Sequence, residues 1–189
     1  MIGPSDLSCG PWIAGGCARR LWFGQPWIDN DVDVFFRSQS DFARSRDRLV
    51  AIPRTEASSS PYITDAVFSI ETANASTHTV RIGKAWPYNA NVQLIKTAWH
   101  PSVTDLFDYF DFTVCRFATD GITIVADRQA IDDCESMVLR RGENTKQRLS
   151  CRRVVKYSIY GFNPAPEVMS ELLCQYHNQK LTETGDDDY

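Results

Sequence analysis

Apolar residues in the first two thirds of the chain occur in short runs and alternations that are typical of β-strands. The expected strands lie at 12–14, 31–36, 66–70, 79–82, 92–95, 110–114 and 122–125. Helices are expected at 17–23 and at about 38–49, and a third, short helix that Ser102 or Thr104 caps should precede the strand at 110–114. Residues 53–61, with two prolines and three serines, read as a loop. This order predicts a mixed α/β unit over residues 1–127.

The hydrophobic period changes after residue 127. The stretches 128–139 and 144–161 predict helices, and Gly161 should end the second of them. Pro164 or Pro166 can occupy the first turn of a last helix that reaches about residue 179. We therefore expect a small helical neck over 128–181 and a disordered acidic tail over 182–189.

Composition and charge describe an ordinary soluble globular protein, with 43% hydrophobic and 23% charged residues. A net charge of -4 argues against a protein that coats nucleic acid without specificity, although it leaves room for a local basic patch. No apolar run approaches the ~20 residues of a membrane span, and no secretory signal is visible. The six cysteines form no Cys-x-x-Cys pair, so we expect reduced thiols in a cytosol-like compartment and no zinc site.

Gly15 and Gly16 stand between the expected strand at 12–14 and the expected helix at 17–23. Without side chains, their backbone can approach a ligand closely, and the helix start behind them offers free N–H groups. The pair is therefore a candidate phosphate-binding turn, with Arg19 near it. Gly-Gly is also common in ordinary turns, so the motif carries little weight by itself.

Asp31 and Asp33 lie two residues apart on one expected strand, so their side chains point to the same face. Two neighbouring carboxylates favour a divalent cation such as Mg²⁺ (or Mn²⁺), which keeps several waters and bridges to substrate phosphates. The alternative interpretation is a solvated strand edge.

Together, these motifs resemble the head of class II CCA-adding enzymes and bacterial poly(A) polymerases, members of the DNA polymerase β type nucleotidyltransferase superfamily. Asp111-Phe112-Thr113-Val114-Cys115 is similar to the family's Arg-Arg-Asp-Phe-Thr-Ile-Asn-Ala segment, and 152–162 is similar to its neck helix. The resemblance spreads over most of residues 12–175. It implies an α+β nucleotidyltransferase fold, with a mixed sheet flanked by helices and a helical neck behind it.

The departures from that family pattern concern catalysis and base selection. Arg20 stands where the family has Asp, and Tyr109 and Phe110 replace the two arginines before Asp-Phe-Thr. The base-reading Glu-Asp-x-x-Arg group has no counterpart at 146–150. The body and tail domains that grip tRNA are missing as well, so the chain resembles stand-alone phage- or virus-type members.

Two positions compete for the third carboxylate that is common in this superfamily. Gln93 could occupy a position where some members have Glu, but an amide supplies no anionic ligand. Asp111, on an apolar expected strand, is favoured as the third catalytic carboxylate, because a buried Asp needs a partner such as a metal or an arginine. Arg153 and Lys156, in a cluster of basic residues, are candidates to meet a triphosphate or RNA. The alternatives are a local salt bridge for Asp111 and a solvated helix face for the basic cluster.

Two functions remain open from the sequence. The first is transfer of a nucleoside monophosphate from a nucleoside triphosphate to an RNA 3′ end or another hydroxyl, such as one on a protein. The second is a catalytically inactive protein of the same fold with a structural or interaction role, for example in a virus particle, because fold does not fix function. The expected location is the host cytoplasm or the virion, without membrane attachment.

Overall fold

The computed structural model describes residues 7–25, 31–50, 69–74, 77–81 and 91–183. The chain divides into two compact units. The first contains Met1–Phe107 and Cys115–Ala126, and the second contains Asp108–Val114 and Asp127–Tyr189. The loop expected at 53–61, the start of the strand expected at 66–70 and the end of the acidic tail lie outside the described residues.

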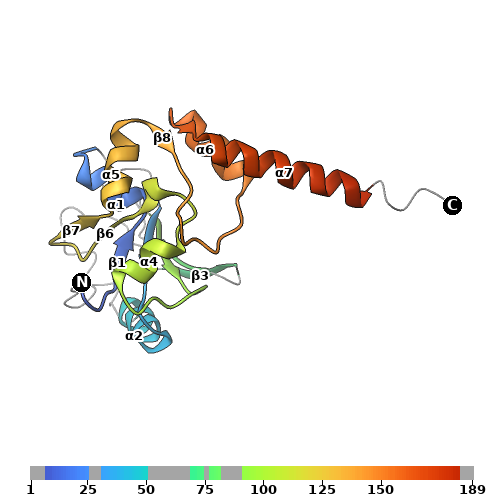
Figure 1. Cartoon of the computed structure of the whole chain (residues 1–189). Helices are drawn as coiled ribbons and strands as arrows, with labels where there is room; N and C mark the ends of the chain where they lie inside the picture. The colour runs from blue at the N-terminus through green and yellow to red at the C-terminus, as the bar shows by residue number, and fades with distance from the viewer. Residues whose placement is uncertain (1–6, 26–30, 51–68, 75–76, 82–90, 184–189) are drawn as a thin grey trace. The chain divides into compact units, whose positions relative to one another are not determined.

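The described part of the first unit contains a seven-stranded sheet with the order β3-β4-β5-β2-β1-β6-β7. Figure 1 labels β1, β3, β6 and β7 of this sheet. Strands β2 and β5 are parallel, and every other neighbouring pair is antiparallel, so the sheet is mixed as expected. The strands are β1 (Trp12–Ala14), β2 (Val32–Phe35), β3 (Ser69–Asn74), β4 (Thr77–Arg81), β5 (Asn91–Ile95), β6 (Phe117–Thr119) and β7 (Ile124–Ala126).

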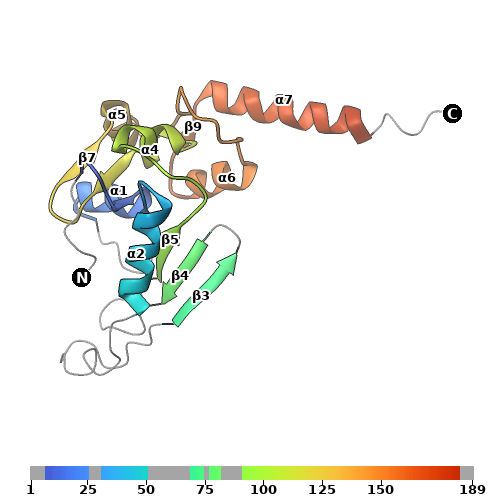
Figure 2. The same ribbon diagram turned by 90° about the horizontal axis from the view of Figure 1, so that it is seen from below.

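The helices α1 (Gly16–Trp22) and α2 (Gln39–Val50) follow β1 and β2, as the sequence predicts. Figure 2 shows α2 beside β5 and β4. The short expected helix is α4 (Val103–Tyr109). Its cap is Ser102, whose hydroxyl accepts a hydrogen bond from the backbone N–H of Asp105 at 3.2 Å.

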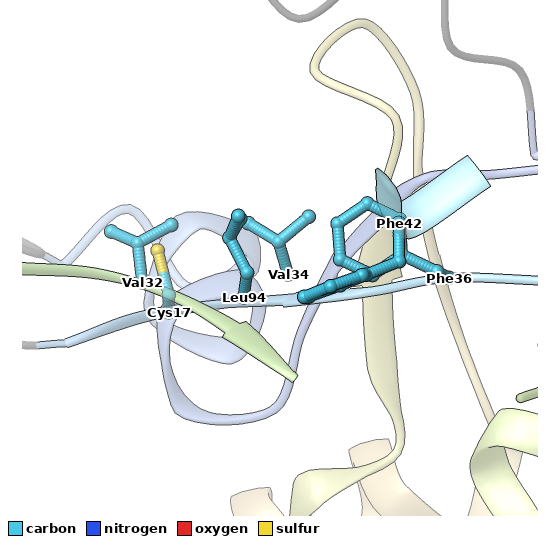
Figure 3. Close-up of a cluster of buried hydrophobic side chains, with 6 residues drawn as sticks. All are labelled: Cys17, Val32, Val34, Phe36, Phe42 and Leu94. Atoms are coloured by element: carbon cyan, nitrogen blue, oxygen red, sulfur yellow. The ribbon is translucent and has the colours of Figure 1, made fainter. Parts of the chain in front are cut away.

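One face of the sheet carries a buried cluster that joins α1 and α2 to the central strands (Figure 3). Cys17 from α1 and Phe42 from α2 pack with apolar side chains of β2 and β5 and with the residue that follows β2. These side chains are Val32, Val34, Phe36 and Leu94. Successive side chains of a strand point to opposite faces of the sheet. The strand residues that alternate with those of the cluster therefore point to the other face.

The strand expected at 110–114 is wrong. Residues Thr113–Cys115 form a 3₁₀ turn, and the strand of this region is β6, which begins at Phe117. All residues from Asp111 to Thr119 are buried, and such a continuous run gives no periodicity from which a strand position can be read. The backbone at Asp111 and Thr113 bonds instead to Gly142 and Arg140, at 3.1 and 3.0 Å.

The described part of the second unit contains the segment that makes these backbone bonds, two short helices, two short strands and one long helix. These helices and strands are α5 (Arg128–Glu135), β8 (Val138–Leu139), α6 (Cys151–Ile159), β9 (Asn163–Pro164) and α7 (Pro166–Glu183). Gly161 follows α6 with φ 94°, and α7 begins at Pro166, both as expected. The helices predicted at 128–139 and 144–161 are too long. The first ends at Glu135, because residues 138–139 form β8 and pair with β9, and the second begins only at Cys151.

None of the helices in the described part of the chain has both the length and the apolarity that a membrane crossing requires.

Candidate active site

Gly15 makes the turn between β1 and α1 in a conformation that other residues avoid. Its φ is 80° and its ψ is -137°. Its backbone N–H donates to the carbonyl of Phe117 in β6 at 3.0 Å, which fixes the turn to the sheet. Gly16 has room around it, because a Cβ added there would meet no atom within 4 Å. The turn therefore combines a backbone that needs glycine with open space beside it.

Asp31 and Asp33 lie at the beginning of β2. Asp31 is exposed just before the strand, and Asp33 is half-buried within it. Val32 and Val34, on either side of Asp33, belong to the buried cluster. The two aspartates therefore point away from that cluster, toward the other face of the sheet, as their spacing predicts.

The Cys17 thiol directly follows the glycine turn in the chain. It is buried beside Val32 in the first turn of α1 (Figure 3). Burial raises the pKa of Cys17 above its ordinary value, the negative charge of Asp33 raises that pKa further, and Arg20 acts in the opposite direction. Strand pairing also sets the glycine turn beside the start of β2: β1 and β2 are antiparallel with Ile13 opposite Val34, so by the same register the end of β1 at Ala14 lies opposite Asp33. The structure thus brings the turn next to Asp33, which lies 17 residues after Gly16 in the sequence.

Arg19, the candidate triphosphate contact, is buried within α1. Arg20, its neighbour, is half-buried. Both lie in the last turn of α1, and the first turn of this helix carries no acidic residue. The helix that follows the glycine turn is therefore positively charged, which suits an anionic ligand.

Gln93 occupies the position beside Asp33 in the sheet. Strands β2 and β5 pair in parallel with Asp33 opposite Gln93, and both side chains are half-buried. The sequence left Gln93 and Asp111 as competing positions for the third site residue. The pairing shows that Gln93, which carries an amide, occupies the position on β5 next to Asp33.

Asp111 lies in the second unit, where both of its carboxylate oxygens accept hydrogen bonds from Arg153. The Arg153 Nε and terminal nitrogen donate at 2.6 and 2.9 Å. Asp111 is 5% exposed, so this two-point ion pair provides the partner that a buried carboxylate needs. The local salt bridge that the sequence left open for Asp111 is thus present. A catalytic role for Asp111 stays a prediction.

Arg153 and Lys156 lie on α6, and each contacts an aromatic ring. The Arg153 guanidinium stands 5.9 Å from the ring centre of Phe112 and 5.7 Å from that of Tyr157. The Lys156 ammonium stands 6.0 Å from the ring centre of the exposed Tyr160. Their nucleotide-binding role, expected from the sequence, stays a prediction, and the contacts seen here hold Arg153 within the second unit.

Sequence reasoning missed a buried acid, Asp133 on α5, which is 2% exposed. Its carboxylate accepts from the Thr113 hydroxyl at 2.7 Å, from the Gln129 amide at 3.0 Å and from the Arg140 Nε at 3.3 Å. The only sequence signal was an aspartate on the apolar side of an amphipathic helix. Asp133 anchors Thr113 and is therefore a structural rather than a chemical centre.

The donor set fits a single magnesium-like ion better than a closed metal cage. Among the described residues, no three acidic, histidine or cysteine side chains gather in a group that could hold a metal. Asp31 and Asp33 provide two oxygen donors, and Mg²⁺ is commonly bound through one or two carboxylates with substrate phosphates and water as the other ligands. The residues present therefore fit an ion that binds together with a phosphate-bearing substrate.

Solved structures of CCA-adding enzymes are similar to this chain. The Bacillus stearothermophilus CCA-adding enzyme in complex with CTP aligns with a TM-score of 0.55 and 15% identity, over 85% of this chain and 38% of that one. The Thermotoga maritima CCA-adding enzyme complexed with tRNA aligns with a TM-score of 0.51 and 14% identity, over 85% and 36%. An apo CCA-adding enzyme gives a TM-score of 0.56 and 14% identity, over 91% and 39%. The chain thus spans less than half the length of these enzymes, and the likeness establishes the nucleotidyltransferase head fold.

Comparison with the curated proteins gives no sequence match. The sequence profile of the Gad2 family, described as Gabija anti-defense 2 family protein, matches residues 5–136. That range contains β1, the glycine turn, both candidate metal-binding aspartates and β5. An anti-defense family fits the phage- or virus-type member that the departures from the CCA-adding pattern indicate. The chain belongs to the Gabija anti-defense 2 family, and the residues that match this family lie in a nucleotidyltransferase fold.

Proposed function

We propose that this protein transfers a nucleoside monophosphate from a nucleoside triphosphate to a hydroxyl acceptor, an RNA 3′ end or a protein side chain, and that this transfer counteracts the Gabija defence. The observation that supports the proposal is the antiparallel register of β1 and β2, which sets the end of β1, where the glycine turn begins, beside Asp33. A phosphate-binding turn and a carboxylate pair on adjacent elements are what transfer at a triphosphate needs.

In this reaction the acceptor hydroxyl oxygen attacks the α-phosphorus of the triphosphate. A new phosphorus–oxygen bond forms, the bond to the β-phosphate bridging oxygen breaks, pyrophosphate leaves and the hydroxyl proton passes to solvent. The backbone at Gly15 and Gly16 accommodates the phosphates, and the positive charge of Arg19 and Arg20 in α1 offsets their negative charge. Asp31 and Asp33 would hold Mg²⁺ or Mn²⁺, which neutralises charge on the transferring phosphate when bound.

The second candidate function is that of an inactive member that acts by binding a partner. The observations that favour it are the neutral Gln93 beside Asp33 and the engagement of both Asp111 oxygens by Arg153. Under this alternative, the two aspartates of β2 would be dispensable for counteracting Gabija.

The deciding experiment incubates the purified protein with each radiolabelled nucleoside triphosphate, Mg²⁺ and either total RNA or protein extract. The wild type is compared with the double variant Asp31→Asn/Asp33→Asn. The matched control is Asp47→Asn/Asp132→Asn, which removes the same charge at two exposed aspartates paired with Arg46 and Arg128. An Asp111→Asn variant tests the third carboxylate.

We expect label transfer by the wild type and the control, and a loss of at least about a hundredfold in the Asp31/Asp33 variant, as for removal of a group that stabilises transition-state charge. Transfer identifies the nucleotide and the acceptor class. If neither the wild type nor any variant transfers label, while the Asp31/Asp33 variant still counteracts Gabija in cells, the inactive alternative replaces this proposal.

A further inference from the structure

Gln93 lies directly across from Asp33 on the neighbouring parallel strand. Val32 pairs with Val92 and Val34 with Leu94 in the same register. These flanking residues pack in or against the buried cluster, so Asp33 and Gln93 share the opposite face. Neighbouring strands are separated by about 4.8 Å, a distance that side chains of this length can bridge.

An amide at this position has a different effect from an acid. It has the shape of glutamate but no charge, and it offers two N–H donors besides its carbonyl oxygen. A glutamate there would add a third negative charge beside Asp31 and Asp33 and would repel them. A glutamine can donate to the Asp33 carboxylate and fix its orientation, as groups behind metal ligands commonly do.

We propose that Gln93 is a positioning residue that orients Asp33 and limits the metal site to two carboxylates, so that this site needs a substrate phosphate to complete the binding of its ion. The proposal rests on the proposed function for the identity of the ion. It concerns an interaction between two neighbouring side chains, and that interaction is testable without any ion.

The first measurement is the coupling between positions 33 and 93 in the metal-free protein, followed as the midpoint of thermal unfolding. Gln93→Glu should lower the midpoint by about 2–4 °C, as for a loss near 1 kcal/mol in a protein of this size. The swapped variant Asp33→Asn/Gln93→Glu should recover most of that loss, because it restores one acid and one amide. The control Gln39→Glu adds the same charge at an exposed position in the first turn of α2, where the helix N-terminus favours an anion, and should not lower the midpoint.

The second measurement is a Mn²⁺ titration without nucleotide, followed by the electron paramagnetic resonance signal of free Mn²⁺. Gln93→Glu should bind Mn²⁺ about tenfold more tightly than the wild type, and Gln93→Ala about tenfold more weakly, as for the loss of an orienting partner. Gln39→Glu should match the wild type.

The outcomes separate this inference from the proposed function. Coupling between positions 33 and 93 with no Mn²⁺ binding by any variant would refute the metal-dependent function and the limit on the metal site, while the orienting contact would stand. Mn²⁺ binding that depends on Asp33 but is the same in Gln93→Glu, Gln93→Ala and the wild type would overturn the inference and leave the function intact. Absence of coupling in the metal-free protein would also overturn the inference.

Discussion

Single side chains in this protein take their chemical properties from what packs around them. His100 shows this well, since it is 4% exposed, and its ring lies 5.9 Å from that of Phe35. Its backbone N–H donates to the carbonyl of Phe36 at 3.1 Å. Burial lowers the pKa of His100 below its ordinary value of 6.5, and the nearby Asp105 acts in the opposite direction. The folded protein therefore favours the neutral imidazole.

This burial predicts a pH dependence of stability. Below about pH 6.5, the unfolded chain takes up a proton at His100 that the folded protein resists, so stability falls as the pH drops through that value toward the lower folded pKa. We expect the unfolding midpoint in urea to fall more between pH 7.5 and pH 5 for the wild type than for His100→Gln, which has no titrating group. Equal falls in the two proteins would contradict this interpretation of His100.

At the scale of elements, the connection between β1 and α1 gives the two glycines different roles. Gly15 adopts a φ of 80° with a ψ of -137°, a region that is almost restricted to glycine. Gly16 is the first residue of α1 and has open space where a side chain would point. The first glycine is therefore required by the fold, and the second is free to serve a ligand.

Alanine substitutions separate these two roles. Gly15→Ala should lower the free energy of unfolding by about 1–3 kcal/mol through backbone strain. Gly16→Ala should change it by no more than about 0.5 kcal/mol, as for an accommodated surface substitution, yet weaken nucleotide binding by occupying the open space. Urea unfolding and titration with a nucleoside triphosphate measure the two effects. Normal nucleotide binding by Gly16→Ala would show that phosphates do not approach this turn.

At the scale of the whole molecule, the chain passes from the first unit to the second and back before it enters the second unit again. The segment Asp108–Val114 belongs to the second unit, and the chain returns to the first unit at Cys115. Asp111 is bonded to Arg153 on α6, and Thr113 to Asp133 on α5. Arg140 extends this network from Asp133 to Glu167 on α7 at 3.2 Å. Charged and hydroxyl side chains therefore connect the segment Asp108–Val114 with α5, α6 and α7.

The buried Asp133 should be the most sensitive part of this network. Asp133→Asn replaces a charged acceptor of three hydrogen bonds, and we expect it to lower the free energy of unfolding by about 1.5–3 kcal/mol. Thr113→Val keeps the shape of the side chain and removes one of the three bonds, so it should cost only about 1 kcal/mol. In the double variant, the Thr113 change should cost less than it does alone, because its acceptor is already altered. Additive losses would show that the two residues act independently.

The sequence by itself determined the alternation of strands and helices, the glycine turn and the shared face of Asp31 and Asp33. These features depend on hydrophobic period and on the conformational freedom of glycine, which are local properties. The strand at 117–119 was missed because the run around it is buried throughout and carries no period.

Only the tertiary structure decided which residues become neighbours. It placed Gln93 on the strand beside Asp33, paired Asp111 with Arg153 and buried Asp133 against Thr113. The three pairs are 60, 42 and 20 positions apart in the sequence. Strand order and packing bring them together, and local sequence patterns do not encode either of these. The carboxylate pair, and Gln93 as a candidate beside it, were therefore readable from the sequence, whereas the residues that bond to the buried Asp111 and Asp133 were not.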